Sequence, residues 1–171
     1  APGAAARAGG RARGRGPREA RAGATNRRRG RAAVALVESV CGLEPPTVQL
    51  LDLSKNPISD GADGAAAGTY DAEVFSRVGQ LLCAEGGALH TLRLGHTQLC
   101  GDSDAGYARE GVVELAQALR RSTRLATLDL RGNHMRDEEA KQLADALQER
   151  RGRGELPSLT LDLSTNSLSA E

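Results

Sequence analysis

The chain has 171 residues with three aromatic residues, three cysteines and a formal net charge of +1. Residues 1–33 contain ten arginines and one acidic residue, a net +9, whereas residues 34–171 contain thirteen Lys and Arg against twenty-one Asp and Glu, a net −8. The odd cysteine count, with no CxxC or Cys/His cluster, argues against a disulfide framework and a zinc site. No apolar run approaches the roughly 18 residues of a membrane span, so the sequence predicts an intracellular chain without a membrane segment.

The first segment, residues 1–33, consists almost entirely of Ala, Gly, Arg and Pro. Such a composition buries too little apolar surface to offset the entropy of ordering, so we expect a disordered basic tail. Its arginine runs at residues 10–16 and 27–31 suit weak contact with nucleic acid or with an acidic partner, although no interleaved aromatic residue could stack on bases. A targeting role and the absence of any function are alternatives, and the composition does not choose among the three.

Residues 34–47 are predicted to form a short helix and cap. Val34, Val37 and Val40 are spaced three apart, which puts them on one face of a helix that ends at Gly42. A pair of prolines follows and prevents the helix from continuing. We therefore expect this segment to pack on the first strand of the domain that follows.

Four later segments share the pattern LxxLxLxxNxL, and they extend through residues 48–171. In each copy two leucines are spaced two apart, so that both point to the same face of a short strand. The second copy has Thr97 in place of the Asn, and the fourth begins with Ser158 in place of an apolar residue. The aligned segments are residues 48–58, 89–99, 125–135 and 158–168.

The polar residue at the end of each strand is predicted to stabilise a repeat turn. Its amide can turn inward and satisfy backbone groups that a tight turn leaves unpaired in neighbouring repeats. A threonine can do only part of this, so we expect the second turn to be the loosest. The four turn residues are Asn56, Thr97, Asn133 and Asn166.

Amphipathic helices are predicted between the strands, because apolar residues recur there at helical spacing. The stripes are Val74, Val78, Leu81 and Leu82; Val112, Leu115, Ala116 and Leu119; and Ala140, Leu143, Ala144 and Leu147.

The turn residues are 41, 36 and 33 residues apart. These unequal distances are explained by one repeat unit of constant length that is interrupted by insertions of different lengths. The distance from Leu119 to Asn133 is 14 residues, as is that from Asn133 to Leu147, giving a 28-residue unit with insertions of 13, 8 and 5. The Gly- and Ala-rich stretches 61–68 and 101–106 and the run 150–154 are predicted to be surface loops. Strands, helices and the loops between them are therefore predicted to alternate along residues 48–171.

A 28-residue LxxLxLxxNxL unit followed by a helix containing LAxAL, here at residues 115–119 and 143–147, resembles the ribonuclease-inhibitor type of leucine-rich repeat. The resemblance covers about residues 48–171. It implies an α/β solenoid with short parallel strands on a concave face and helices on a convex face. The class serves many partners, so the resemblance indicates a fold more specifically than a function.

In such a solenoid, the residues between and after the paired leucines point at whatever is bound. The candidate partner-binding residues are Asp52, Arg93, Asp129, Arg131 and Asp162.

These residues predict a polar, mildly acidic surface, and we expect a non-enzymatic module that binds a protein partner through it and through the inserted loops. Exposed alternating charges also serve simply to solvate a strand face, and that interpretation competes at every position. No catalytic residue, cofactor site or metal site is predicted, because His90, His96 and His134 lack an evident nucleophile or third ligand.

Two alternative functions remain from sequence. Ran GTPase-activating proteins are built from the same repeat, so the resemblance also admits a GTPase-activating regulator. Nucleic-acid association through residues 1–33 is the other alternative. A cytoplasmic location is expected, with the nucleus as the alternative that the basic tail suggests.

Overall fold

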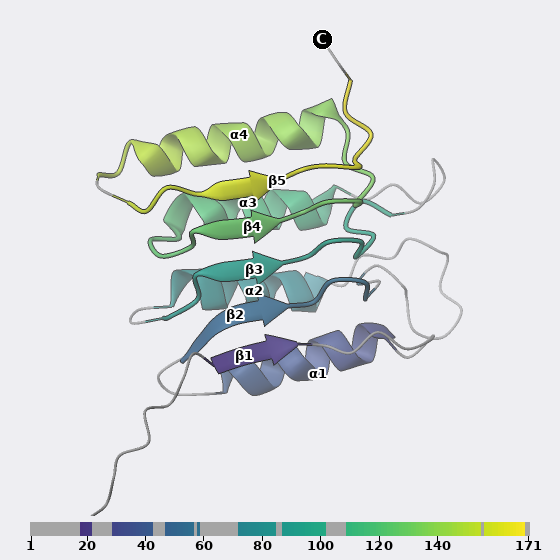
Figure 1. Cartoon of the computed structure of the whole chain (residues 1–171), viewed down its shortest axis with the longest axis vertical. Coiled ribbons are helices and arrows are strands. Elements are labelled where there is room, and N and C mark those ends of the chain that lie inside the picture. The colour runs from purple at the N-terminus through teal and green to yellow at the C-terminus, as the bar shows by residue number, and fades with distance from the viewer. Residues whose placement is uncertain are drawn as a thin grey trace, which may run out of the picture.

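The computed structural model describes residues 18–21, 29–42, 47–56, 58, 72–84, 87–101, 109–154 and 156–169. They form an α/β fold in which strands and helices alternate along the chain (Figure 1). In chain order the elements are β1 (Arg18–Arg21), α1 (Arg29–Cys41), β2 (Val48–Asp52), α2 (Ala72–Cys83), β3 (Thr91–Arg93), α3 (Glu110–Arg121), β4 (Thr127–Asp129), α4 (Asp137–Arg151) and β5 (Thr160–Asp162).

The strands form one parallel sheet in which their spatial order is their order in the sequence. The leucines of the strands are aligned across the sheet: Leu51 pairs with Leu92, Leu92 with Leu128, and Leu128 with Leu161. The first three of these side chains are completely buried. The strand positions predicted from the LxL spacing are therefore confirmed, and each unit adds one strand and one layer of core.

The four helices lie on the same side of the sheet, stacked in the order of the strands (Figure 1). In α2, Val74 and Val78 are at most 1% exposed, as their spacing predicts. In α3 the predicted stripe is also buried, with Val112 and Leu119 fully inaccessible. The helix stripes therefore close the core against the leucines of the strands, and the opposite face of the sheet carries mainly polar side chains, with Leu50 as an apolar residue among them.

Helix α4 differs from the prediction in its orientation and length. Leu143 is buried as expected, but Ala144 is exposed and Ala146 is fully buried instead. The buried positions of α4 also include Glu139 and Arg150, which lie on the face that packs against α3. The prediction of a loop from residue 150 is wrong at its start, because the helix continues through Arg151.

The N-terminal part contains more structure than the sequence indicated. Arg18–Arg21 forms β1, which pairs in parallel with β2, and α1 begins at Arg29 rather than at Val34. The prediction of a disordered tail through residue 33 is wrong at these positions, because β1 occupies the backbone edge of β2. Within α1, Val37 and Val40 are buried as predicted.

Several predictions fall on residues outside the described part of the chain. These include residues 1–17 and 22–28 of the basic segment, the proline pair, the insertion at 61–68 and most of the insertion at 101–106. None of the helices in the described ranges combines the length and apolar character that crossing a membrane requires.

Candidate functional site

The turns that follow the strands set the positions of the candidate binding residues, and Asn133 organises two of these turns. Its side-chain oxygen accepts hydrogen bonds from the backbone N–H groups of Thr97 (2.9 Å) and Leu99 (3.2 Å) in the preceding turn. Its side-chain nitrogen donates to the carbonyls of Leu94 (2.7 Å) and Leu130 (3.0 Å). Asn133 is completely buried, so it links two successive units through a water-excluded network.

Asn166 repeats this arrangement one unit later. Its oxygen accepts from the N–H groups of Asn133 (2.9 Å) and Met135 (3.1 Å), and its nitrogen donates to the carbonyls of Leu130 and Leu163. The inward orientation predicted for the turn asparagines is therefore confirmed at both positions.

Thr97 fills the equivalent place with fewer bonds. Its hydroxyl donates to the Leu94 carbonyl of its own turn at 2.9 Å, and the Ile58 N–H bonds to the Thr97 backbone carbonyl at 2.9 Å. In the first turn, the Asn56 side chain donates to the carbonyls of Leu53 and Ser54. Thr97 thus satisfies its own turn while a backbone bond joins it to the first one, and the greater looseness expected of its turn remains a prediction.

Three of the candidate aspartates also stabilise their own turns. Asp52, at the end of β2, accepts a hydrogen bond from the backbone N–H of Ser54 at 3.0 Å. Asp162 accepts one from the Ser164 N–H at 3.0 Å and another from the Ser164 hydroxyl at 2.7 Å. These bonds lower the pKa of Asp162 below its ordinary value, and the nearby Arg131 adds to this effect.

Asp129 accepts from the N–H of Arg131 in the same way, at 3.1 Å. Each aspartate therefore closes an Asx turn at the end of its strand. Its carboxylate has a structural role that is independent of any partner.

The five candidate residues form two neighbouring charged groups on the sheet, Asp52 with Arg93 and Asp129 with Arg131 and Asp162. Arg131 contacts Asp129 through Nε at 2.9 Å and through Nη2 at 2.5 Å, and its Nε lies 3.9 Å from Asp162. Arg93 lies 3.8 Å from Asp52. Hydrogen bonding and charge from Asp129, with smaller contributions from Asp162 and Asp52, raise the pKa of Arg131. We call these five residues the strand face.

Gly95 gives the central ion pair its space. A Cβ at this position would lie 3.2 Å from Cγ of Arg131 and 3.3 Å from Oδ1 of Asp129. Any larger residue would therefore press on the pair from the neighbouring unit. The sequence did not predict this contact, because the glycine belongs to one repeat and the ion pair to the next. The signal in the sequence is that Gly95 occupies a position at which the other repeats carry Ser or Arg.

Exposure separates the strand-face residues into contact groups and supports. The side chains of Arg131, Arg93 and Asp162 are 49%, 41% and 41% exposed, whereas that of Asp129 is 7% exposed. The expectation that Asp129 contacts a partner directly needs correction, because Arg131 and the turn enclose its carboxylate. Asp129 instead holds the Arg131 guanidinium in one orientation through Nε and Nη2, while the arginine side chain stays half exposed.

The chemistry available to this face is recognition by charge and hydrogen bonding. Within the described ranges, no group of three His, Cys, Asp or Glu side chains is arranged to hold a metal ion. The face offers paired carboxylates and guanidinium groups with a net charge of −1 across its five residues.

Comparison with protein-family models gives no match to this chain, and comparison with curated proteins gives none either.

Proposed function

We propose that the chain is part of a leucine-rich-repeat solenoid of the ribonuclease-inhibitor type and serves as a non-enzymatic protein-binding module. The four registered LxxLxLxxNxL segments, the in-register parallel strands and the side-chain bonds of Asn133 and Asn166 support the repeat assignment. Strands and helices alternate through every unit, as such a solenoid requires.

The observation that carries the functional proposal is the continuous strand face. Its charged residues extend from Asp52 on β2 to Asp162 on β5. Each follows a leucine that points to the helices, so alternation along the strand places it on the opposite side of the sheet; Figure 1 shows the helices together on one side. Asp129 and the turn fix the Arg131 guanidinium before any partner arrives. A side chain held in its binding orientation loses less conformational entropy on association, so such a face favours binding.

The partner is a protein that presents basic and hydroxyl groups. Asp52 and Asp162 offer carboxylate oxygens at the two ends of the row, while Arg93 and Arg131 offer guanidinium donors between them. A partner with mixed charges in the complementary order would pair with all four groups. Specificity then comes from the order of charges along the strands rather than from the net charge alone.

The test is affinity capture with a charge-neutral strand face. Asn replaces Asp52, Asp129 and Asp162 in one variant, because asparagine keeps the oxygen that accepts the turn N–H and removes only the charge. The control makes the same charge change on exposed helix positions, with Glu38→Gln, Glu138→Gln and Asp145→Asn.

We expect the strand-face variant to lose proteins that the wild type and the helix variant both retain, with unchanged far-ultraviolet circular dichroism. If both variants capture the same proteins as the wild type, the strand face is not the binding surface.

A further inference from the structure

The edge of the molecule at which α3 and α4 end carries four exposed arginines. Arg121 and Arg151 lie in the last turns of the two helices, and Arg124 and Arg153 follow in the loops that lead to β4 and β5. Within the described ranges, none of the four forms an ion pair. We call these four residues the basic edge.

A buried arginine of α4 holds the loop between α3 and β4 against that helix. Arg150 is 3% exposed, and it donates from Nε to the Ser122 carbonyl at 2.9 Å and from Nη2 to the Leu125 carbonyl at 2.7 Å. Burial lowers the pKa of this guanidinium. The backbone bond from Thr160 N–H to the Ala126 carbonyl, at 2.9 Å, joins the start of β5 to the same loop before β4. The loop that carries Arg124 is therefore fixed against α4 and β5.

Helix stability explains only part of this charge. Cations in the last turn of a helix interact favourably with its dipole, which accounts for Arg121 and Arg151. That effect falls off beyond the last turn, so it does not account for Arg124 or Arg153. The exposed Glu149 in the last turn of α4 pairs with Arg120 at 3.0 Å, and the four arginines gathered here repel one another, which weakens the folded state. The two loop arginines thus have no evident structural benefit.

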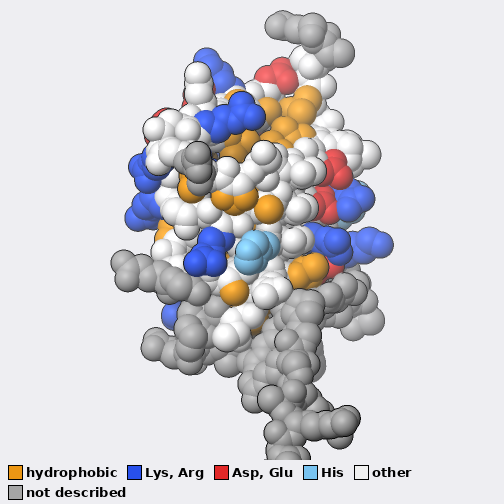
Figure 2. Space-filling view, turned by 60° about the vertical axis from the view of Figure 1, so that its left-hand side comes forward, with side chains coloured by type: hydrophobic (Ala, Val, Ile, Leu, Met, Phe, Trp, Pro, Cys, Tyr) orange, Lys and Arg blue, Asp and Glu red, His pale blue; other side chains and the backbone are white. Residues whose placement is uncertain are grey.

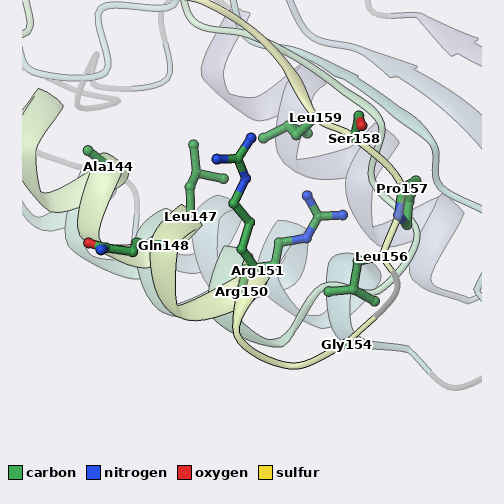
Figure 3. A pocket seen from close by; sticks show the side chains of 10 residues that line it. All are labelled: Ala144, Leu147, Gln148, Arg150, Arg151, Gly154, Leu156, Pro157, Ser158 and Leu159. Atoms are coloured by element: carbon green, nitrogen blue, oxygen red, sulfur yellow. The ribbon is translucent and has the colours of Figure 1, made fainter.

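A cavity lined by both apolar and polar side chains opens beside the basic edge. It has a volume of about 530 Å³ and lies between α4 and the loop before β5 (Figure 3). Leu147 and Arg151 of the helix face Leu156, Pro157 and Leu159 of the loop across it. Figure 2 shows an apolar patch near the top of the molecule with Lys and Arg side chains beside it. Positive charge therefore adjoins a recess in which leucine and proline side chains are accessible.

We propose that the basic edge and this cavity bind an acidic protein segment that carries a leucine-sized apolar side chain. Carboxylates of the segment pair with the exposed guanidinium groups, which match carboxylates in geometry as well as in charge. Its apolar side chain enters the cavity and removes the leucine side chains there from water. The basic edge lies before the amino-terminal ends of β4 and β5, whereas the strand-face residues lie at or just after the carboxyl-terminal ends of their strands. The two sites are therefore separate.

A protein segment fits this surface better than a nucleic acid does. Single-stranded nucleic acids gain much of their affinity from bases stacked on aromatic side chains. Among the described residues that form the basic edge and line the cavity, none is aromatic. The leucines and proline of the cavity instead match an aliphatic side chain.

The test measures binding of a fluorescein-labelled peptide, Ser-Glu-Glu-Leu-Glu-Glu-Ser, to the full chain by fluorescence anisotropy. The variant Arg124→Gln with Arg153→Gln removes two charges from the basic edge. Lys55→Gln with Lys141→Gln removes two exposed charges elsewhere and serves as the matched control. The arginines of residues 1–33 are the same in both variants, so their contribution to binding cancels in the comparison.

We expect the basic-edge variant to bind about tenfold more weakly than the wild type, the loss that two exposed ion pairs produce, and the control to stay within about twofold. Replacing the leucine of the peptide by alanine should weaken binding to the wild type further. The melting temperature of the basic-edge variant should equal or exceed that of the wild type, since it loses repulsion.

Equal affinities of the two variants would overturn the proposal, because binding would then be due to general charge or to the N-terminal arginines. Equal binding of the leucine and alanine peptides would overturn the role of the cavity. A single-stranded oligonucleotide of equal charge that binds more tightly than the peptide, and loses affinity with the same two arginines, would assign the edge to nucleic acid instead.

Discussion

Replacing Asn133 by alanine should strongly destabilise the fold, because its side-chain oxygen is the acceptor of two buried N–H groups. In the substituted protein the N–H groups of Thr97 and Leu99 lose their acceptor, and both residues are at most 1% exposed. The carbonyls of Leu94 and Leu130 are less affected, since each also accepts from Thr97 or Asn166. The cost therefore comes mainly from two unsatisfied donors.

An unsatisfied buried donor costs about 1–3 kcal/mol, so the two together predict a loss of about 2–6 kcal/mol in the free energy of unfolding. Asn166→Ala is the matched control: it removes the acceptor of the Asn133 and Met135 N–H groups, whose residues are also buried, but Asn166 itself is only partly buried, so water can enter the space of its side chain and reach both groups. Urea denaturation followed by circular dichroism measures both losses. If Asn133→Ala costs less than about 1 kcal/mol, or no more than Asn166→Ala, the reasoning is refuted.

Two further predictions concern the turns, and a third concerns Asp137 at the start of α4. Thr97→Asn adds a side-chain donor toward the Leu53 carbonyl and should raise the free energy of unfolding by about 1 kcal/mol in urea denaturation; a loss would contradict this. Gly132→Ala should cost about 2–3 kcal/mol, because φ is +62° and the new Cβ would overlap the His96 ring; adding His96→Ala should restore part of it. The hydrogen bonds from Ser169 lower the pKa of Asp137, so its stabilisation is present above about pH 4 and is lost as pH falls through the folded-state pKa. Thermal melts should therefore show a smaller acid-induced decrease in Tm for Asp137→Asn than for the wild type, and identical decreases would exclude this contribution.

The strands and their turns could be predicted because each repeat carries the signal within a few residues. Leucines two apart define the buried side of a strand. Asn133 and Asn166 occupy the same position of the LxxLxLxxNxL pattern, and each bonds to the turn of the preceding unit. The same local logic identified the buried faces of α2 and α3. Repetition thus turned short patterns into a reliable assignment of elements.

The features that were not predicted depend on neighbours far along the chain. Arg18–Arg21 pairs with β2 through its backbone, and its sequence has no apolar alternation to indicate a strand. The rotation of α4, which buries Ala146 and exposes Ala144, depends on packing against α3. Because both residues are alanines, the sequence itself does not show which of them is buried. The burial of Asp129 requires the space left by Gly95 in the preceding unit.

The most direct test of the protein-binding proposal is carboxylate footprinting of the strand face. Carbodiimide labelling is measured at Asp52 and Asp162, and at Glu138 and Asp145 on α4, with and without a protein obtained by affinity capture. We expect the partner to protect Asp52 and Asp162 and to leave the two helix carboxylates labelled as before. Protection of Glu138 and Asp145, with full labelling of Asp52 and Asp162, would contradict the proposal and assign binding to the helices.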